Sequence, residues 1–237
     1  MKIFINHILS ALWLLLIVTQ TCIAVEPIVQ VYEVLKAEAE KGDAEAQCNL
    51  GFMYASGRGV TKDEFEAAKW FRKASEQGDA KAQYFLGFMN ASGRGVTKDE
   101  KEAVHWFRKA AEQGYAEAVN WLRKASEQGD AEAQYALGFI YISGRGVTKD
   151  KKQAIYWCRE AAKRGNTKAQ SNLGVQYSMG AGVAKDYVES YKWRLLAAAQ
   201  GSETAKLAAP ALEINMTREQ IAEGQKLARE FKPTVRH

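Results

Sequence analysis

The sequence predicts an all-α fold, an α-solenoid of antiparallel helix pairs with capping helices at both ends, on three observations. Closely similar segments open at Gly42, Gly78, Gly114, Gly129, Gly165 and Gly201. Four steps between these glycines are 36 residues long and one is 15. Within the segments, apolar residues recur every three or four positions, which is the period of a helix. A fixed repeat of this length indicates helix pairs that bury their apolar faces by stacking on neighbours.

Each full segment is expected to hold two helices, named A and B here. In the copy over residues 129–164, helix A begins after the N-cap Asp130 and ends before the glycines of the sequence GRGV. Helix B begins after Asp150. Each Asp before helix B has Gln or Glu three residues later, which predicts a capping box in every full copy. The pairs are Asp63 with Glu66, Asp99 with Glu102, Asp150 with Gln153, and Asp186 with Glu189.

Helix B carries a tryptophan at one fixed repeat position. Every tryptophan except Trp13 occupies this position, namely Trp70, Trp106, Trp121, Trp157 and Trp193. We interpret these residues as core anchors between neighbouring pairs.

The start of the chain is predicted to be a signal peptide over residues 1–24. Lys2 supplies the basic start, residues 8–18 are almost wholly apolar, and Cys22 and Ala24 are small residues before a cleavage site after Ala24. An uncleaved membrane anchor is the alternative, although the apolar run is shorter than the ~20 residues of a membrane span. We therefore expect an exported protein, periplasmic or secreted, with no stable membrane insertion after the signal is removed.

The mature chain, residues 25–237, is expected to form one solenoid. A capping helix runs from Pro27 to about Lys41, and two helices within residues 201–237 form the C-terminal cap. The repeats span about 42–77, 78–113, 114–128, 129–164 and 165–200. The copy over 114–128 lacks the glycine loop, and no glycine or proline interrupts it between Tyr115 and Gln128. It is therefore predicted to be one continuous helix that serves as helix A for the pairs before it and as helix B for the pairs after it.

The residues provide little for catalysis. Apart from the signal, His105 and His237 are too far apart for a metal site or a catalytic triad, and no serine has lysine three positions later. Cys48 and Cys158 lie in distant repeats, so we expect no disulfide between them. The net charge of +5 is modest, with lysines and glutamates alternating along the helices. We therefore predict no catalytic residue, no cofactor, no metal and no nucleic-acid partner.

The repeated pattern resembles the Sel1-like repeat, a TPR-like family. Its signature stands in the first copy as Leu50, Gly51, Tyr54, Gly57, Gly59, Val60, Asp63, Ala67 and Trp70. The resemblance implies a bacterial scaffold for protein–protein interaction, with roles in some relatives in host-cell contact or envelope assembly. Some secreted relatives bind or hydrolyse β-lactams, so a cell-wall-related or β-lactam-binding enzyme is the alternative. The cysteine-rich secreted members carry a disulfide in each repeat, a feature that this sequence lacks.

The A helices supply the candidate binding surface. Residues at i, i+3 and i+7 should line an inner groove with apolar side chains and a charged rim, and its members are Glu45, Phe52, Lys81, Tyr84, Phe88, Glu132, Tyr135 and Phe139. The alternative is that the phenylalanines pack between adjacent A helices. A second surface, a basic strip of the loop residues Arg58, Lys62, Arg94 and Lys98, gives a weaker expectation of anionic glycans or lipid head groups as partners. The sequence thus favours a non-enzymatic adaptor that binds an unidentified protein or peptide.

Overall fold

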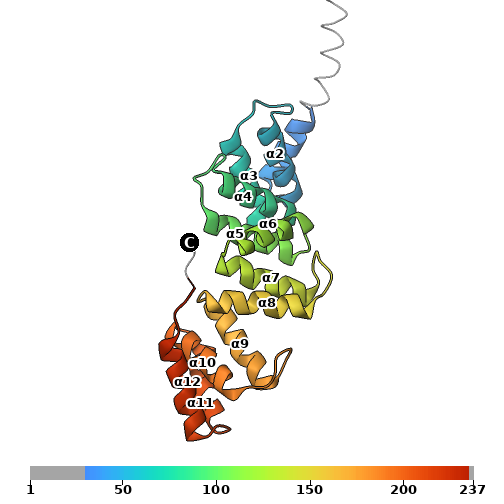
Figure 1. Cartoon of the computed structure of the whole chain (residues 1–237). Coiled ribbons are helices and arrows are strands. Elements are labelled where there is room, and N and C mark those ends of the chain that lie inside the picture. Colours follow the sequence, from blue (N-terminus) through green and yellow to red (C-terminus); the bar gives the residue numbers. More distant parts are fainter. Residues whose placement is uncertain (1–29, 235–237) are drawn as a thin grey trace, which may run out of the picture. The chain divides into compact units, whose positions relative to one another are not determined.

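The computed structural model describes residues 30–234, and this part of the chain consists of helices joined by short turns, with no strand (Figure 1). The predicted signal peptide, residues 1–24, and its cleavage site lie outside the described residues. The chain divides between Ala103 and Val104 into two compact units, called unit 1 and unit 2 below. The all-α prediction is confirmed.

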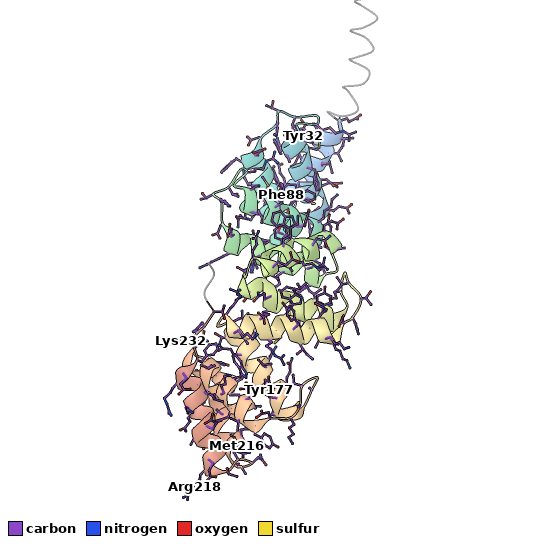
Figure 2. All side chains as sticks on the ribbon, in the orientation of Figure 1. Tyr32, Phe88, Tyr177, Met216, Arg218 and Lys232 are labelled. Carbon is purple, nitrogen blue, oxygen red and sulfur yellow. The ribbon has the colours of Figure 1, made fainter. Side chains whose placement is uncertain are left out.

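Unit 1 begins with the expected N-terminal helix, over residues 30–40. The helices α2 (Ala44–Ser56), α3 (Glu64–Glu76) and α4 (Ala80–Ser92) follow, and α5 (Glu100–Glu112) begins in this unit. Helices α2 and α3 pack as one pair, and α3 also packs against α4. Ala39, Leu50 and Trp70 form a buried cluster at the start of the unit. At its edge the hydroxyls of Tyr32, labelled in Figure 2, and Tyr54 lie 3.1 Å apart.

Unit 2 holds most of α5 and the remaining helices. These are α6 (Ala116–Glu127), α7 (Ala131–Ser143), α8 (Lys151–Lys163), α9 (Thr167–Met179), α10 (Tyr187–Ala199), α11 (Glu203–Glu213) and α12 (Arg218–Glu230). The pairs α7 with α8 and α9 with α10 repeat the packing of α2 with α3, and both α11 and α12 pack against α10. Cys158, Leu173 and Trp193 belong to one buried core cluster of this unit.

Some of the helix B tryptophans are core anchors, as predicted, and the others are only half-buried. Trp70, Trp106 and Trp193 are buried, which confirms them as core anchors. Trp121 and Trp157 are half-buried. The Trp121 ring stacks on Phe107 with centroids 4.9 Å apart, so it still joins α6 to α5.

The capping boxes predicted for the B helices form only one of their two hydrogen bonds. Each Asp side chain caps its helix as expected; the Asp63 carboxylate, for example, accepts hydrogen bonds from the backbone N–H groups of Phe65 and Glu66. The return bond from the third residue is missing because the backbone N–H of the Asp is already bound by a carbonyl of helix A. Asp63, Asp150 and Asp186 donate to the carbonyls of Tyr54, Tyr141 and Tyr177 at 2.9–3.0 Å, and Asp99 donates to Asn90 at 2.9 Å. A complete capping box does form at Thr217 and Gln220 in α12.

The short copy is one uninterrupted helix, α6, as predicted. Its first turn has lost the usual cap, because Tyr115 stands at the N-cap position and makes no side-chain cap hydrogen bond. Towards α7 it acts as a B helix. The backbone N–H of Asp130 donates to the carbonyl of Ala125, as that of Asp79 does to Ala74 after α3.

Candidate functional site

The A helices α2, α4, α7 and α9 are held by a buried glutamine that sequence reasoning missed. Its amide nitrogen donates to the backbone carbonyl eight residues earlier, at 2.9–3.1 Å, in Gln47, Gln83, Gln134 and Gln170. The side chains of Gln77 and Gln200 donate in turn to the amide oxygens of Gln47 and Gln170, both at 2.8 Å. The motif AQ recurs at the same place in every full copy and was the available signal.

In the pairs α2–α3, α7–α8 and α9–α10, a glycine of helix A lets it approach helix B closely. A Cβ on Gly138 would lie 3.0 Å from the carbonyl oxygen of Ala154 in α8. At Gly51 it would lie 2.8 Å from the Phe71 ring, and at Gly174 3.2 Å from the carbonyl oxygen of Ser190. The glycine of the sequence LG therefore sets the spacing between helices A and B. This close contact also fixes the face that helix A turns towards helix B.

In unit 1 two of the predicted groove residues, Phe52 and Lys81, take part in contacts between helices. The Phe52 ring lies edge-on to Phe71 and Phe85, with centroids 5.0 and 4.5 Å away, and the Lys81 ammonium lies 4.4 Å from the centre of the same ring. Tyr84 is half-buried and contacts Phe85. Packing between neighbouring A helices, the alternative to a groove, therefore describes Phe52.

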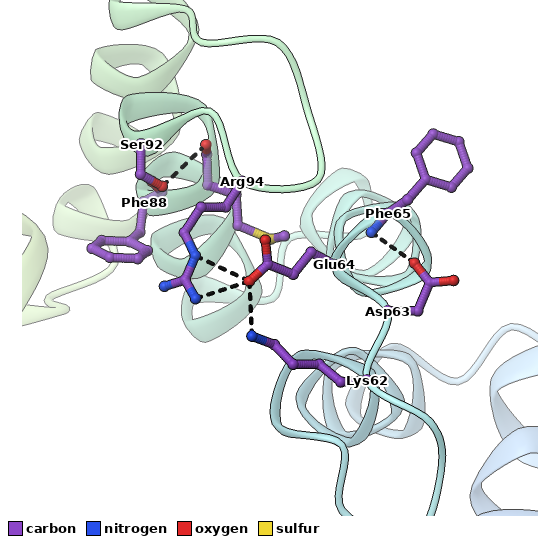
Figure 3. A network of polar contacts seen from close by, with 8 residues as sticks. Lys62, Asp63, Glu64, Phe65, Phe88, Ser92 and Arg94 are labelled. Carbon is purple, nitrogen blue, oxygen red and sulfur yellow. Dashed lines mark hydrogen bonds and ion pairs between the residues drawn. The ribbon is translucent and has the colours of Figure 1, made fainter.

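Two further predicted residues of unit 1 differ in exposure. Glu45 is an exposed residue in the first turn of α2. Phe88 is half-buried, and its carbonyl accepts a hydrogen bond from the Ser92 hydroxyl at 2.8 Å (Figure 3). These residues do not form a continuous exposed apolar surface in unit 1.

In unit 2 the predicted residues belong to a surface that joins α7 to α9. Glu132 accepts a hydrogen bond from the Asn166 side chain at 2.9 Å, and Tyr135 accepts one from Asn172 at 3.4 Å. The Tyr135 ring packs against the core cluster that contains Cys158, Leu173 and Trp193, and its burial raises the pKa of the phenol. Phe139 is 46% exposed.

Besides Phe139, further exposed apolar residues lie on the A helices α7 and α9 of unit 2 and on α11, the first helix of the cap. We call this set the A-helix strip, and its members are Phe139 and Ile142 on α7, Val175 and Met179 on α9, Leu207 on α11 and Ile214 at the end of α11. Leu207 and Ile214 are 78% and 87% exposed. Gly201 opens α11 as the other glycines open A helices, and Leu207 stands at the repeat position of Tyr135, so extending the predicted groove into the cap would have found Leu207. Ile214 stands at the position of Ile142, which the prediction did not include.

Hydrogen bonds hold the helices under the A-helix strip together. The Arg194 guanidinium of α10 donates to the Ser178 hydroxyl of α9 at 3.2 Å and to the carbonyl of Ala208 in α11 at 3.1 Å. Burial lowers the pKa of this guanidinium. Arg194 therefore links α10 to both α9 and α11, two of the helices that carry the strip.

The basic strip predicted in the loops is largely neutralised. Glu64 binds both Lys62 at 3.1 Å and Arg94 at 2.8 Å, and the hydrogen bonds from these cations hold its pKa below the usual range (Figure 3). Lys98 lies 3.4 Å from Glu100. These ion pairs reduce the positive charge on which binding of anionic glycans or lipid head groups would depend.

Both cysteines of the described chain are free and buried, as expected for residues in distant repeats. Burial raises the pKa of the Cys48 thiol to about 12 and that of Cys158 to about 11. Within residues 30–234, no group of three or more His, Cys, Asp or Glu side chains is placed to hold a metal ion. None of the helices described here has both the length and the apolarity that crossing a bilayer requires.

Comparisons with known proteins identify the repeat. A curated relative, the secretory immunoglobulin A-binding protein EsiB of Escherichia coli O6:H1, is 50% identical over 42 residues, which are 18% of this chain and 9% of EsiB. Among solved structures, a protective antigen of uropathogenic Escherichia coli strains with an SLR fold is 32% identical, with 84% of this chain and 48% of that chain covered and a TM-score of 0.47. A Sel1 repeat protein from Oxalobacter formigenes is also 32% identical, with 81% and 89% covered and a TM-score of 0.40.

The chain thus spans less than half the length of EsiB and of the protective antigen. The Sel1 repeat family itself matches residues 44–79, 80–115, 115–130, 131–166 and 167–202, which together make up more than half of the chain. These boundaries follow the helix pairs and isolate the short copy. The chain therefore belongs to the Sel1 repeat family.

Proposed function

We propose that this protein is an exported, non-enzymatic scaffold that binds a protein or peptide through the A-helix strip of unit 2. Sel1 repeat proteins typically serve as protein-interaction scaffolds. The export step rests on the predicted signal peptide over residues 1–24. The name of the relative EsiB, a secretory immunoglobulin A-binding protein, is consistent with protein binding outside the cytoplasm, and the 42 matched residues leave the partner of this chain open.

The exposure of the strip is the observation that carries the proposal. Ten large hydrophobic side chains are exposed in the described residues, and six of them belong to the A-helix strip. Single exposed apolar residues are ordinary on a protein surface, and we take the gathering of six of them on three helices of unit 2 as the mark of an interaction surface. Polar groups such as Asn172, Lys168 and Lys206 lie on the same helices and supply the rim expected around an apolar interface.

A pull-down with residues 25–237 as bait tests the proposal. The double variants Phe139→Ser/Ile142→Ser and Leu207→Ser/Ile214→Ser remove apolar side chains that are 46–87% exposed, so folding should be preserved. Because anchor residues dominate interface energies, each double variant should reduce recovery of the partner at least about tenfold. Tyr84→Ala and Tyr135→Ala extend the same test to the predicted groove.

The matched control variants are Tyr156→Ser and Val34→Ser, which remove exposed apolar side chains outside the strip. They should leave recovery unchanged. Equal recovery by the strip variants and the wild-type protein would disprove binding at the strip. Nitrocefin turnover by the mature chain that disappears on mutation of one surface residue would instead support the enzyme alternative, and retention of the protein in the cytoplasm after cell fractionation would contradict export.

A further inference from the structure

The outward-facing side of α3 in unit 1 combines one exposed aromatic ring with three cations. Phe65, Lys69, Arg72 and Lys73 stand at i, i+4, i+7 and i+8 and so share one face of the helix. Phe65 is 69% exposed. The other full copies have Lys101, Lys152 and Val188 at its position, so the aromatic ring is particular to this copy. Neither core packing nor the A-helix strip accounts for it.

These side chains line a groove between α3 and the turn at residues 93–96. The groove has a volume of about 270 Å³, and Phe65, Ala68 and Val96 form its apolar part. We call it the α3 groove. It lies wholly within unit 1.

The wall of the groove opposite α3 is fixed in place. A Cβ on Gly95 would overlap the backbone carbonyl of Glu64, so the turn rests directly on the start of α3. Arg94 adds two hydrogen bonds to one carboxylate oxygen of Glu64, from Nε at 3.1 Å and from Nη2 at 2.8 Å. Figure 3 shows this cluster, with the Phe65 ring pointing away from it. A groove that is formed in advance spares a ligand the cost of ordering its walls.

The charges along the groove favour an anionic ligand. Its lining has three cations, Lys69, Arg72 and Lys73, and one acid, Glu76. Lys69 binds Glu66 at 2.9 Å, and the Lys73 ammonium lies 4.0 Å from the centre of the Trp70 ring. Arg72 has no ion pair among the described residues, which leaves its guanidinium available for a carboxylate.

We propose that the α3 groove binds a short acidic peptide segment that carries one aromatic or large aliphatic side chain, a function separate from that of the A-helix strip. The apolar side chain packs on Phe65 and Val96, and the carboxylates pair with Arg72 and Lys73. The helical rise places Arg72 about 10 Å along the axis from Phe65. An extended peptide covers this distance in about three residues, so the acidic residues follow or precede the apolar residue by two to four positions.

A peptide array tests the proposal with the full mature chain. The array presents peptides with one Phe and two Glu at every separation from one to six positions in a Gly-Ser background, together with versions in which Lys replaces Glu or Ala replaces Phe. Peptides with Glu two to four positions from Phe should bind, and neither replacement series should. Affinities of the bound peptides are then measured by fluorescence anisotropy.

Three variants test which side chains contribute to peptide binding. Phe65→Lys installs the residue found in two other copies, and Arg72→Glu reverses one charge; each should weaken binding about tenfold or more, as expected for an anchor and for a close charge pair. Lys151→Glu makes the same change in net charge on an exposed residue of unit 2 and should have no effect. Raising the salt concentration from about 0.05 M to about 0.5 M should also weaken binding, because it screens exposed charges.

Absence of binding to any Phe–Glu peptide, equal binding of the Lys series, or unchanged affinity of Phe65→Lys would overturn the proposal. Binding to vesicles of anionic phospholipid without binding to the peptides would assign the groove to a membrane surface instead. The double variants of the A-helix strip should retain the affinity of the wild-type protein for these peptides. Failure of one proposal is therefore distinguishable from failure of the other.

Discussion

Gln134 and Gln170 occupy the same repeat position, but their amide oxygens have different surroundings. The oxygen of Gln170 accepts a hydrogen bond from Gln200, whereas the buried oxygen of Gln134 has no partner within the described chain. Arg164 stands at the place that corresponds to Gln200, and its guanidinium lies against Gly129. An unsatisfied buried acceptor lowers stability, so this copy carries a local defect.

Replacing Arg164 with Gln should correct this defect. The new side chain can donate to Gln134 as Gln200 does to Gln170, and the free energy of unfolding should rise by about 0.5–1.5 kcal/mol. Urea denaturation followed by circular dichroism measures the change. The reverse variant, Gln200→Arg, should lower stability by a similar amount, and a loss of stability in Arg164→Gln would show that Arg164 contributes more than the missing hydrogen bond.

At the level of the helices, local signals in the sequence located the elements well and their non-local contacts less well. The Asp N-caps and the glycine C-caps act within a few residues, so each helix end could be read from the chain itself. The absent half of the capping box has a non-local cause, since the N–H of Asp63 is already bound to the carbonyl of Tyr54. The buried glutamines likewise depend on how helix A meets the preceding turn, which residue spacing alone does not reveal.

The close crossing of α7 and α8 decides whether Gly138→Ala raises or lowers the stability of the protein. Alanine has a helix propensity about 1 kcal/mol more favourable than glycine, so Gly138→Ala should stabilise an isolated helix. In the protein the new Cβ would lie 3.0 Å from the Ala154 carbonyl and 3.3 Å from the Cys158 nitrogen, which are backbone atoms that move only with α8. We therefore expect a net loss of about 1–3 kcal/mol, as is typical of overpacked cores.

Thermal and urea unfolding of Gly138→Ala measure this loss. Ala222→Gly, at an exposed position of α12, is the control for propensity alone and should cost about 1 kcal/mol. A stability of Gly138→Ala equal to or above that of the wild-type protein would mean that α7 and α8 separate at little cost.

At the level of the whole molecule, the same repeat position has different exposure in different copies. Phe52 and Phe139 are equivalent, but Phe85 of the following A helix covers Phe52, whereas Asn172 occupies the corresponding place after Phe139. The repeat therefore predicted the fold and the face on which a site would lie, while the neighbouring copy decides which members are exposed. The sequence therefore predicted groove residues in both units. In the structure, most of the exposed apolar residues lie in unit 2.

The end of the chain tests how far a perturbation spreads through such an array. After α12 the Phe231 ring returns to Trp193, with centroids 5.4 Å apart, and the backbone N–H of Thr234 donates to the carbonyl of Lys163 at the end of α8. Phe231 is half-buried, so Phe231→Ala should destabilise unit 2 by about 1–2 kcal/mol, less than the full burial of an aromatic ring provides. In a repeat protein each element depends mainly on its neighbours.

The rate of hydrogen exchange in Phe231→Ala, followed by mass spectrometry, should therefore increase in α8–α12 and stay unchanged in α2–α4. Leu207→Ala, which truncates a 78% exposed side chain, is the control and should alter neither region. Equal acceleration in all helices of Phe231→Ala would show that the described chain unfolds as one cooperative body, contrary to this expectation.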